Sequence, residues 1–185
     1  LRKEGLERGV PGLGDVVRLA RLAADPEPTT AEGFRGVLNA GLNRTRVIAQ
    51  VLVTDEVGRV LLCELTYKTY WDLPGGVVDP HESPAAGAAR EVLEELGVEI
   101  TVEDLLVVSW LPPWQGWDDA CLFLFRAAAP SDVVEAAMLE HREIAALHWC
   151  ASEDLDEHVA DYTARLVRAA LEATEPLYLE DARPR

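Results

Sequence analysis

Three glutamates, Glu91, Glu94 and Glu95, lie within five residues of one another in the stretch "AREVLEELGV". On a helix, residues spaced i, i+3 and i+4 share one face, so the three carboxylates would point in the same direction. Like charges at this spacing repel each other by roughly a few tenths of a kcal/mol per pair. Clustered carboxylate oxygens are also the ligands that Mg²⁺ and other hard cations prefer. A solvated acidic helix face is the alternative interpretation.

The residues around the glutamates predict where this helix begins and ends. Ser83 and Pro84 form an N-cap and first-turn pair, and Gly97 supplies a left-handed stop, so we expect a helix over 84–96. A turn of about 100° per residue gathers one apolar side toward the core. That side consists of Ala85, Ala88, Ala89, Val92, Leu93 and Leu96. Gly87 lies on the carboxylate face and leaves room for a loop or a ligand to come close.

The spacing of the fixed residues resembles the Nudix box, G-x5-E-x7-R-E-U-x-E-E-x-G-U, in which U is aliphatic. The sequence matches every fixed position, with Gly76, Glu82, Arg90-Glu91-Val92, Glu94-Glu95 and Gly97-Val98. The resemblance covers about residues 46–170. It implies an α/β fold, a Nudix-type α/β/α sandwich with a mixed β-sheet. It also implies a metal-dependent pyrophosphohydrolase that cleaves a nucleoside diphosphate linked to another group.

The resemblance also assigns roles to individual residues. It implies metal ligands at Glu91, Glu94 and Glu95, at the backbone carbonyl of Gly75, and at Glu82 directly or through water. Arg90 would hold the carboxylates in position, and the expected cofactor is Mg²⁺ or Mn²⁺. Catalysis would therefore rest on Arg90 and the three glutamates of the helix. The base that activates the water is one of these glutamates or an outside carboxylate, with Asp118, Asp119, Glu135, Glu140 and Glu143 as candidates.

The substrate is less closely defined by the sequence. Trp114 and Trp117 lie in the polar loop "WLPPWQGWDD", where exposed indoles could stack a nucleobase, and Lys68 precedes the box and could reach a phosphate. The alternatives are core or dimer-interface tryptophans and a solvated lysine. Pro113 lies about where the ADP-ribose-hydrolysing branch has a proline. We therefore expect ADP-ribose or a nucleotide sugar, with nucleoside triphosphate hydrolysis and non-hydrolytic nucleotide sensing as alternatives.

Composition restricts the classes of partner. The formal net charge of −16 over 185 residues argues against nucleic-acid binding, which needs a cationic face. A small anionic ligand remains compatible with this charge if a metal ion reverses the local field. The three cysteines, Cys63, Cys121 and Cys150, show no zinc spacing and are expected to be reduced core thiols. No apolar run predicts a signal peptide or a membrane span, so a cytoplasmic protein is expected, and a homodimer is left open.

The chain is expected to contain three parts. Residues 1–45 form an N-terminal extension with predicted helices over 15–24 and from Thr29, where Thr29 and Glu32 have capping-box spacing. Residues 46–175 form the Nudix hydrolase domain, and residues 176–185 form a C-terminal tail. Within the domain, the runs 47–54 and 59–65 read as a β-hairpin. Further strands are expected over 104–111, 121–127 and 144–150, and a final helix over 161–174.

Overall fold

The computed structural model describes residues 2–7, 16–20, 24–114 and 116–184. The chain divides into two compact units, Leu1–Arg44 and Thr45–Arg185, and each is described by itself. The first unit contains β1 (Arg2–Glu7), β2 (Val16–Ala20) and α1 (Ala31–Gly41). The described part of the second unit contains β3 (Arg46–Leu52), β4 (Val60–Leu65), β5 (Gly75–Val77), α2 (Pro84–Leu96), β6 (Thr101–Leu111), β7 (Ala120–Ala128), α3 (Val133–Ala136), β8 (Ile144–Cys150), α4 (Leu155–His158), α5 (Asp161–Glu172), β9 (Leu177–Glu180) and β10 (Arg183–Pro184).

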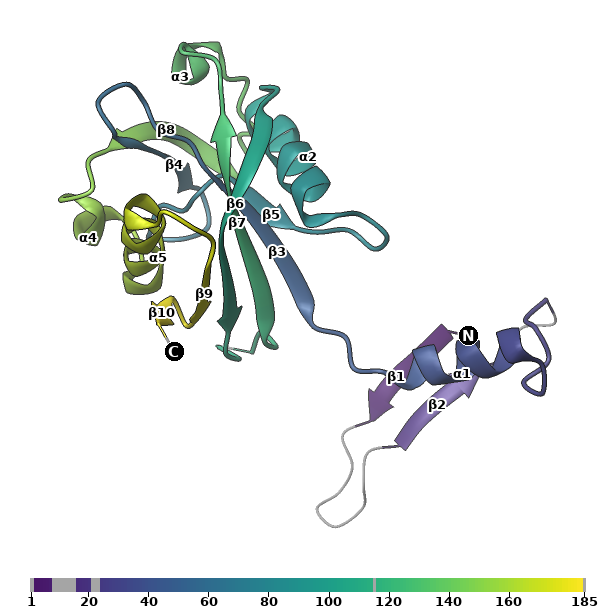
Figure 1. Cartoon of the computed structure of the whole chain (residues 1–185). Coiled ribbons are helices and arrows are strands. Elements are labelled where there is room, and N and C mark those ends of the chain that lie inside the picture. Colours follow the sequence, from purple (N-terminus) through teal and green to yellow (C-terminus); the bar gives the residue numbers. More distant parts are fainter. Residues whose placement is uncertain (1, 8–15, 21–23, 115, 185) are drawn as a thin grey trace. The chain divides into compact units, whose positions relative to one another are not determined.

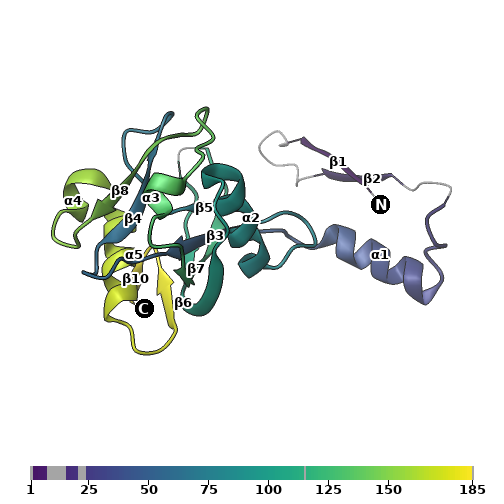
Figure 2. The same ribbon diagram turned by 90° about the horizontal axis from the view of Figure 1, so that it is seen from above.

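The second unit is a three-layer α/β/α sandwich, as the sequence predicted. Its main sheet has the strand order β10-β9-β6-β7-β3-β5, and β4 pairs with β8 in a separate two-stranded sheet. The main sheet is mixed, because β3 pairs with β7 in parallel while β5 runs antiparallel to β3. Helix α2 covers one face of the sheet and α5 the other (Figure 1). Figure 2 shows the same layers from above.

Side chains on β3 alternate between two separate hydrophobic clusters. Ala49, Val51 and Val53 pack in the cluster that contains Ala88, Val92 and Leu96 of α2. Ile48 and Leu52 pack in the other cluster, which contains Leu166, Val167 and Ala170 of α5. This two-residue period is typical of a strand covered on both faces. The alternation fixes β3 between the two helices, so the strand's position relative to α2 is determined by both cores.

The N-terminal unit differs from the sequence prediction in two places. The helix expected over 15–24 is wrong over Val16–Ala20, which forms β2 and pairs antiparallel with β1. The run is short, and its adjacent valines favour a strand once a partner is present. Helix α1 is capped by Thr30 rather than Thr29, because the Thr30 hydroxyl accepts from the N–H of Gly33 at 3.1 Å.

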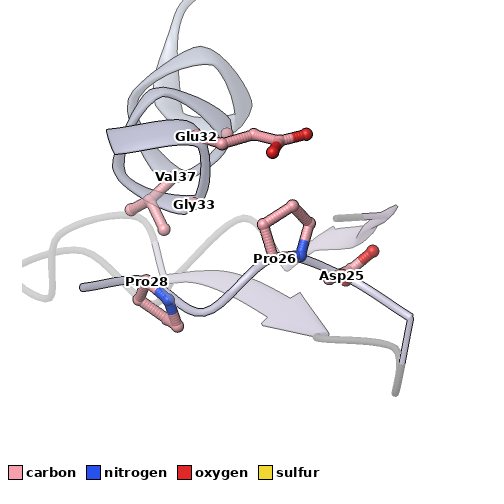
Figure 3. Close-up of a pocket in the computed structure, with 7 residues that line it drawn as sticks. Asp25, Pro26, Pro28, Glu32, Gly33 and Val37 are labelled. Atoms are coloured by element: carbon pink, nitrogen blue, oxygen red, sulfur yellow. The ribbon is translucent and has the colours of Figure 1, made fainter. Parts of the chain in front are cut away.

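Helix α1 packs closely on the turn that precedes it. A Cβ at Gly33 would clash with the backbone carbonyl of Glu27, so the absence of a side chain there allows the contact. Pro26 and Pro28 lie below the helix around a hollow of about 240 Å³ (Figure 3). Its lining residues are Asp25, Pro26, Pro28, Glu32, Gly33, Gly36 and Val37. The hollow belongs to the first unit and contains none of the residues of the Nudix-box pattern.

Two further predictions in the second unit were incomplete. The turn 55–59 closes as expected, with an isolated bridge between Thr54 and Val60, but β3 and β4 then diverge into different sheets. The predicted C-terminal tail, 176–185, contains two strands in its described part, because β9 pairs in parallel with β6 and β10 pairs with β9. Leu177 and Leu179 alternate with exposed residues, which is the strand pattern that the tail prediction missed. Within the described ranges, no helix is long and apolar enough to cross a membrane.

Gly75 is predicted to be irreplaceable for stability. Its φ is +124°, and a Cβ there would clash with the carbonyl oxygen of Ala49 and lie 2.8 Å from Cα of Gln50. We expect Gly75→Ala to lower the free energy of unfolding by about 4 kcal/mol or more, measured by urea denaturation. Gly58→Ala is the matched control, because its φ is +84° and no atom lies within 4 Å of the added carbon. The control should lose only about 1 to 2 kcal/mol, and equal losses in both variants would contradict the close-packing argument.

Candidate active site

Helix α2 has the bounds that its sequence predicted. Ser83 is the N-cap, and its hydroxyl accepts from the N–H of Ala86 at 3.3 Å. Gly97 ends the helix in the left-handed conformation with φ of 67°, and its N–H donates to the carbonyl of Leu93. Of the expected core face, Ala85, Ala88, Val92 and Leu96 pack in the core, whereas Ala89 lies outside the core cluster and Leu93 is 46% exposed. The buried stripe is therefore narrower than the sequence predicted.

The glycine loop before the helix contacts this acidic face through its backbone. The N–H of Gly75 donates to Oε2 of Glu95 at 3.2 Å. A Cβ at Gly76 would lie 2.7 Å from the carboxylate carbon of Glu91, so Glu91 lies directly against this glycine. Gly87 is buried, and a Cβ there would approach Val78 and Glu82 at 3.1 and 3.0 Å. The space that Gly87 leaves is therefore filled by the loop that joins β5 to α2.

Arg90 lies at the centre of the carboxylates and contacts three of them. Its Nε and Nη2 donate to the two oxygens of Glu82 at 3.1 and 3.0 Å, in a bidentate arrangement. Its Nη1 donates to Glu91 and Glu94, each at 3.0 Å, and Nη2 also reaches the carbonyl of Val77 at 3.2 Å. The bonds from Arg90 lower the pKa of Glu82, and the bonds to Glu82, ahead of those to Glu91, raise the pKa of Arg90. One cation thus balances three acids.

Glu95 has no such partner, and its pKa is strongly perturbed. Burial raises the pKa of Glu95 to about 7, while the bond from Gly75 N–H opposes this shift. The negative charges of Glu91, Glu143 and Asp72 raise it further. Burial also raises the pKa of Glu91, against the lowering effect of Arg90. The site therefore concentrates more negative charge than Arg90 compensates, and a further cation would relieve it.

The box glutamates and the glycine-loop carbonyls have the chemistry to bind a divalent cation, although in this structure three of the carboxylates contact Arg90 instead. Among the described residues, no group of three or more Asp, Glu, His or Cys side chains converges on one point as a metal site. The reason is visible in the contacts, because Glu82, Glu91 and Glu94 all turn an oxygen toward the guanidinium of Arg90. Carboxylate and carbonyl oxygens are nevertheless the donor set for Mg²⁺. We expect metal binding to exchange the contact of Glu91 or Glu94 with Arg90 for a contact with the cation.

The structure distinguishes among the carboxylates outside the helix that the sequence analysis named as candidates for the general base. The charge of Glu143 acts on both Glu91 and Glu95. The loop that carries it is anchored to the end of α2, because the N–H of Glu140 donates to the carbonyl of Glu95 at 2.8 Å. The carboxylate of Glu140 itself pairs with Arg142 at 2.9 Å, and Asp119 accepts from Nε1 of Trp110 at 3.2 Å. Glu143 is thus the outside candidate whose charge acts on the box glutamates.

Asp72 is a nearby residue that the sequence analysis did not single out. Its carboxylate accepts from Nε2 of Gln50 at 3.2 Å, and the same nitrogen donates to the carbonyl of Leu73 at 3.3 Å. These bonds fix the segment that leads into Gly75. Lys68 pairs with Asp72 at 3.3 Å and contacts none of the box glutamates. The position of Asp72 directly before "LPGG" was the available sequence signal.

Trp114 and Trp117 lie away from the glutamates, in the turn between β6 and β7. Arg46 pairs in register with Ala120, close to this turn, whereas Gly75 pairs with Gln50, four residues further along β3. At about 3.3 Å per residue, this separation is about 13 Å along the strand. The two indoles are 66% and 61% exposed, so they are not core residues. The structure therefore does not bring the predicted substrate contacts into direct contact with the carboxylates.

This α/β/α sandwich, with a carboxylate-rich helix against a glycine loop, has the architecture of a hydrolase family. A sequence model of the NUDIX domain matches residues 44–170, and the chain belongs to the Nudix hydrolase family. A MutT-like protein from Streptomyces ambofaciens is 30% identical over 153 residues, which cover 83% of this chain and 88% of that protein. A putative 8-oxo-dGTP diphosphatase from Bacillus subtilis is 36% identical over 101 residues, 55% of this chain and 63% of that protein.

Solved structures show the same fold. The crystal structure of a UDP-X diphosphatase aligns with a TM-score of 0.62 at 20% identity and covers 81% of this chain and 75% of its own. The MutT protein from Methanosarcina mazei aligns with a TM-score of 0.59 at 25% identity and covers 73% of this chain and 100% of its own. The chain is therefore an enzyme of the Nudix pyrophosphohydrolase family, whose members generally use divalent metal ions.

The pKa of Glu95 predicts that the metal-free protein loses stability as the pH rises. The folded chain keeps this proton up to about pH 7, whereas the unfolded chain releases it near the ordinary value of 4.5. Between these values the folded state binds more protons, so the free energy of unfolding falls with increasing pH. At about 1.36 kcal/mol per pKa unit, the loss from this group is about 3 kcal/mol.

Glu95→Gln isolates this effect, because a neutral amide oxygen can still accept from Gly75. We expect the difference in free energy of unfolding, wild type minus variant, to decrease as the pH rises from about 4.5 to 8 in the presence of a chelator. Magnesium at pH 8 should restore stability to the wild type more than to the variant. A difference between the two proteins that does not change with pH would show that the Glu95 carboxyl titrates normally.

Proposed function

We propose that this Nudix hydrolase is a Mg²⁺- or Mn²⁺-dependent pyrophosphohydrolase that cleaves a nucleoside diphosphate linked to another group. The observation that carries the proposal is the uncompensated carboxylate cluster on the glycine loop. Glu95 is bound to Gly75, Glu91 lies against Gly76, and Arg90 is the single cation in contact with the box glutamates among the described residues. A pyrophosphate would be repelled from this cluster unless cations bridge the two.

The proposed ligands are the carbonyl of Gly75 and the carboxylates of Glu91, Glu94 and Glu95, with Glu82 at the edge of the site as a ligand directly or through water. When bound, the metal would neutralise phosphate oxygens and activate the attacking water. Arg90 would keep its bidentate contact to Glu82 and so hold the loop 77–82 against α2. Phosphoryl-type displacement depends mainly on positioning and electrostatics, so no protein nucleophile is required.

The proposed general base is Glu95 or Glu143. Glu95 is supported by its place against the glycine loop, where the N–H of Gly75 donates to its Oε2 at 3.2 Å. Glu143 is supported by its electrostatic contact with both Glu91 and Glu95 from outside the helix. Either carboxylate can accept the proton of a water that lies between the helix and the loop carrying Glu143.

The proposed substrate rests on the predicted substrate-binding residues and on the names of similar proteins. We propose that Trp114 and Trp117 contact the nucleoside and that Lys68 contacts a phosphate, within a hydrolase domain over 46–175 that follows the extension 1–45. ADP-ribose or a nucleotide sugar is the first candidate, supported by Pro113 in the same exposed loop. A nucleoside triphosphate is the second, favoured because similar proteins from Bacillus subtilis and Proteus vulgaris are named as 8-oxo-dGTP diphosphatases.

A substrate panel with Mg²⁺ or Mn²⁺ tests the proposal. ADP-ribose that yields AMP and ribose phosphate supports the first candidate, and a triphosphate that releases pyrophosphate supports the second. We expect Glu94→Gln and Glu95→Gln to lower kcat by about 10² to 10⁴-fold with retained folding, because each removes a charge that serves the metal or the water.

Glu99→Gln is the matched control, because Glu99 is an exposed acid just beyond the same helix. This variant should keep wild-type turnover. If both box variants also keep wild-type rates while the wild type hydrolyses a substrate, the carboxylate cluster is not the catalytic centre. Absence of turnover on the whole panel with either metal would refute the proposed substrate class.

A further inference from the structure

The turn between β6 and β7 carries two exposed tryptophans, Trp114 and Trp117. The backbone N–H groups of Trp114 and Trp117 donate to each other's backbone carbonyl oxygens at 3.0 and 2.9 Å, so the two residues form an antiparallel bridge. Residues directly opposite in such a pair project their side chains to the same side. Both indoles are more than 60% exposed, so neither is used to fill the core. The turn therefore offers flat aromatic surface on one side.

Arg46, at the start of β3, is held against this turn by the ring of Trp117. Its guanidinium carbon lies 4.7 Å from the ring centroid of Trp117. Its Nη2 makes one long bond to the carbonyl of Asp118 at 3.4 Å, and its Nε is buried without a hydrogen-bond partner. Among the described residues, Arg46 forms no ion pair with a carboxylate, although the chain has a net charge of −16. Stacking thus fixes the guanidinium and leaves most of its five donors unused.

Acidic groups beside Arg46 argue against a phosphate as its ligand. Asp118 and Asp119 follow Trp117 directly, and Asp119 is held by Nε1 of Trp110. The carboxylate of Asp118 is exposed and has no partner among the described residues. Two acidic residues follow Trp117 in the chain and one guanidinium lies against its ring, so this turn has no excess positive charge for an anion. The same groups together offer donors, acceptors and aromatic faces, which suits a neutral, flat ligand with polar edges.

We propose that Arg46, the Trp114–Trp117 pair and Asp118 form the base-recognition site of this enzyme and select a 6-oxopurine, that is, a guanine-type base. A guanidinium fork donates to the adjacent O6 and N7 acceptors of guanine, and this pairing is the commonest specific arginine–base contact. The opposite edge of guanine carries N1–H and N2–H₂ donors, which the carboxylate of Asp118 can accept. Adenine has a donor in place of O6, and pyrimidines lack N7, so neither matches Arg46 in this way.

The position of the site relative to the glycine loop supports this inference, which rests on the proposed function for its reaction. Among the proposed substrates it favours a guanine nucleotide sugar or triphosphate over ADP-ribose. A base at Arg46 would lie about 13 Å along β3 from Gln50, the partner of Gly75. An extended nucleotide places its sugar and phosphates over such a distance. The turn lies at the end of the sheet where β3 begins (Figure 1). The base and the pyrophosphate would thus be held at two separate points of the same strand.

Matched substrate pairs test the selection of the base. We expect kcat/KM to favour GDP-glucose over ADP-glucose, or GTP over ATP, by about tenfold or more, according to which phosphate chain the enzyme accepts. Arg46→Lys keeps the charge but loses the fork. In this variant the guanine-to-adenine ratio of kcat/KM should approach one, mainly through a higher KM for the guanine substrate.

Arg126→Gln is the control. Arg126 is exposed on β7, pairs in register with Leu52 at the far end of β3, and forms no ion pair among the described residues. This variant should keep the wild-type base preference. The inference is overturned if the wild type shows no preference between matched pairs. It is also overturned if Arg46→Lys lowers kcat/KM equally for both bases, which would indicate a phosphate contact or a structural role.

A binding assay separates this inference from the proposed function. Titration of the full chain with 5′-GMP or 5′-AMP in chelator, followed by tryptophan fluorescence, needs no turnover. We expect tighter binding of GMP, lost in Arg46→Lys, and no effective competition by inorganic pyrophosphate. Selective GMP binding without hydrolysis of any nucleotide would refute the pyrophosphohydrolase but support the base site. Hydrolysis without any base preference would support the enzyme and refute the site.

Discussion

The contact between the glycine loop and the acidic face of α2 is the interaction on which the site depends. Gly76 allows backbone to lie against Glu91, because a Cβ there would meet the Glu91 carboxylate. Gly75, where a Cβ would clash with the backbone of β3, donates its N–H to Glu95. Packing these acids together raises the pKa of both through burial. Arg90 limits the repulsion by contacting three neighbouring carboxylates. The site is thus an electrostatic balance in which the fold supplies less positive charge than the carboxylates need.

The two hydrophobic clusters keep this balance in place. Helix α2 is anchored by Ala88, Val92 and Leu96 in one core, while the opposite face of β3 is held by the core under α5. Gln50, buried on β3, binds Asp72 and the carbonyl of Leu73 and so positions the segment that enters the glycine loop. Neither the glutamates nor the loop could keep their spacing if β3 moved relative to α2. The stability of the sheet therefore sets the geometry of the site.

The part of the site that depends on local sequence could be predicted, and the part that depends on long-range pairing could not. Ser83 and Gly97 define the ends of α2 by their own backbone chemistry, so its bounds and its acidic face followed from the sequence. The divergence of β3 and β4 into different sheets, and the pairing of β9 with β6, depend on partners far along the chain. The same limit applies to Glu143 and Arg46. Each is an ordinary charged residue until the fold places it beside the glutamates or the indoles.

The central claim is that the box carboxylates and the carbonyl of Gly75 bind divalent cations in exchange for contacts with Arg90. Crystals soaked with Mn²⁺ and a non-hydrolysable nucleotide would test it through the anomalous signal of manganese. The account predicts one or more peaks about 2.2 Å from oxygens of Glu91, Glu95 and Gly75. It also predicts that Arg90 retains Glu82 and releases Glu91 or Glu94. A fully occupied nucleotide with no manganese near these oxygens, and Arg90 still bound to all three carboxylates, would contradict it.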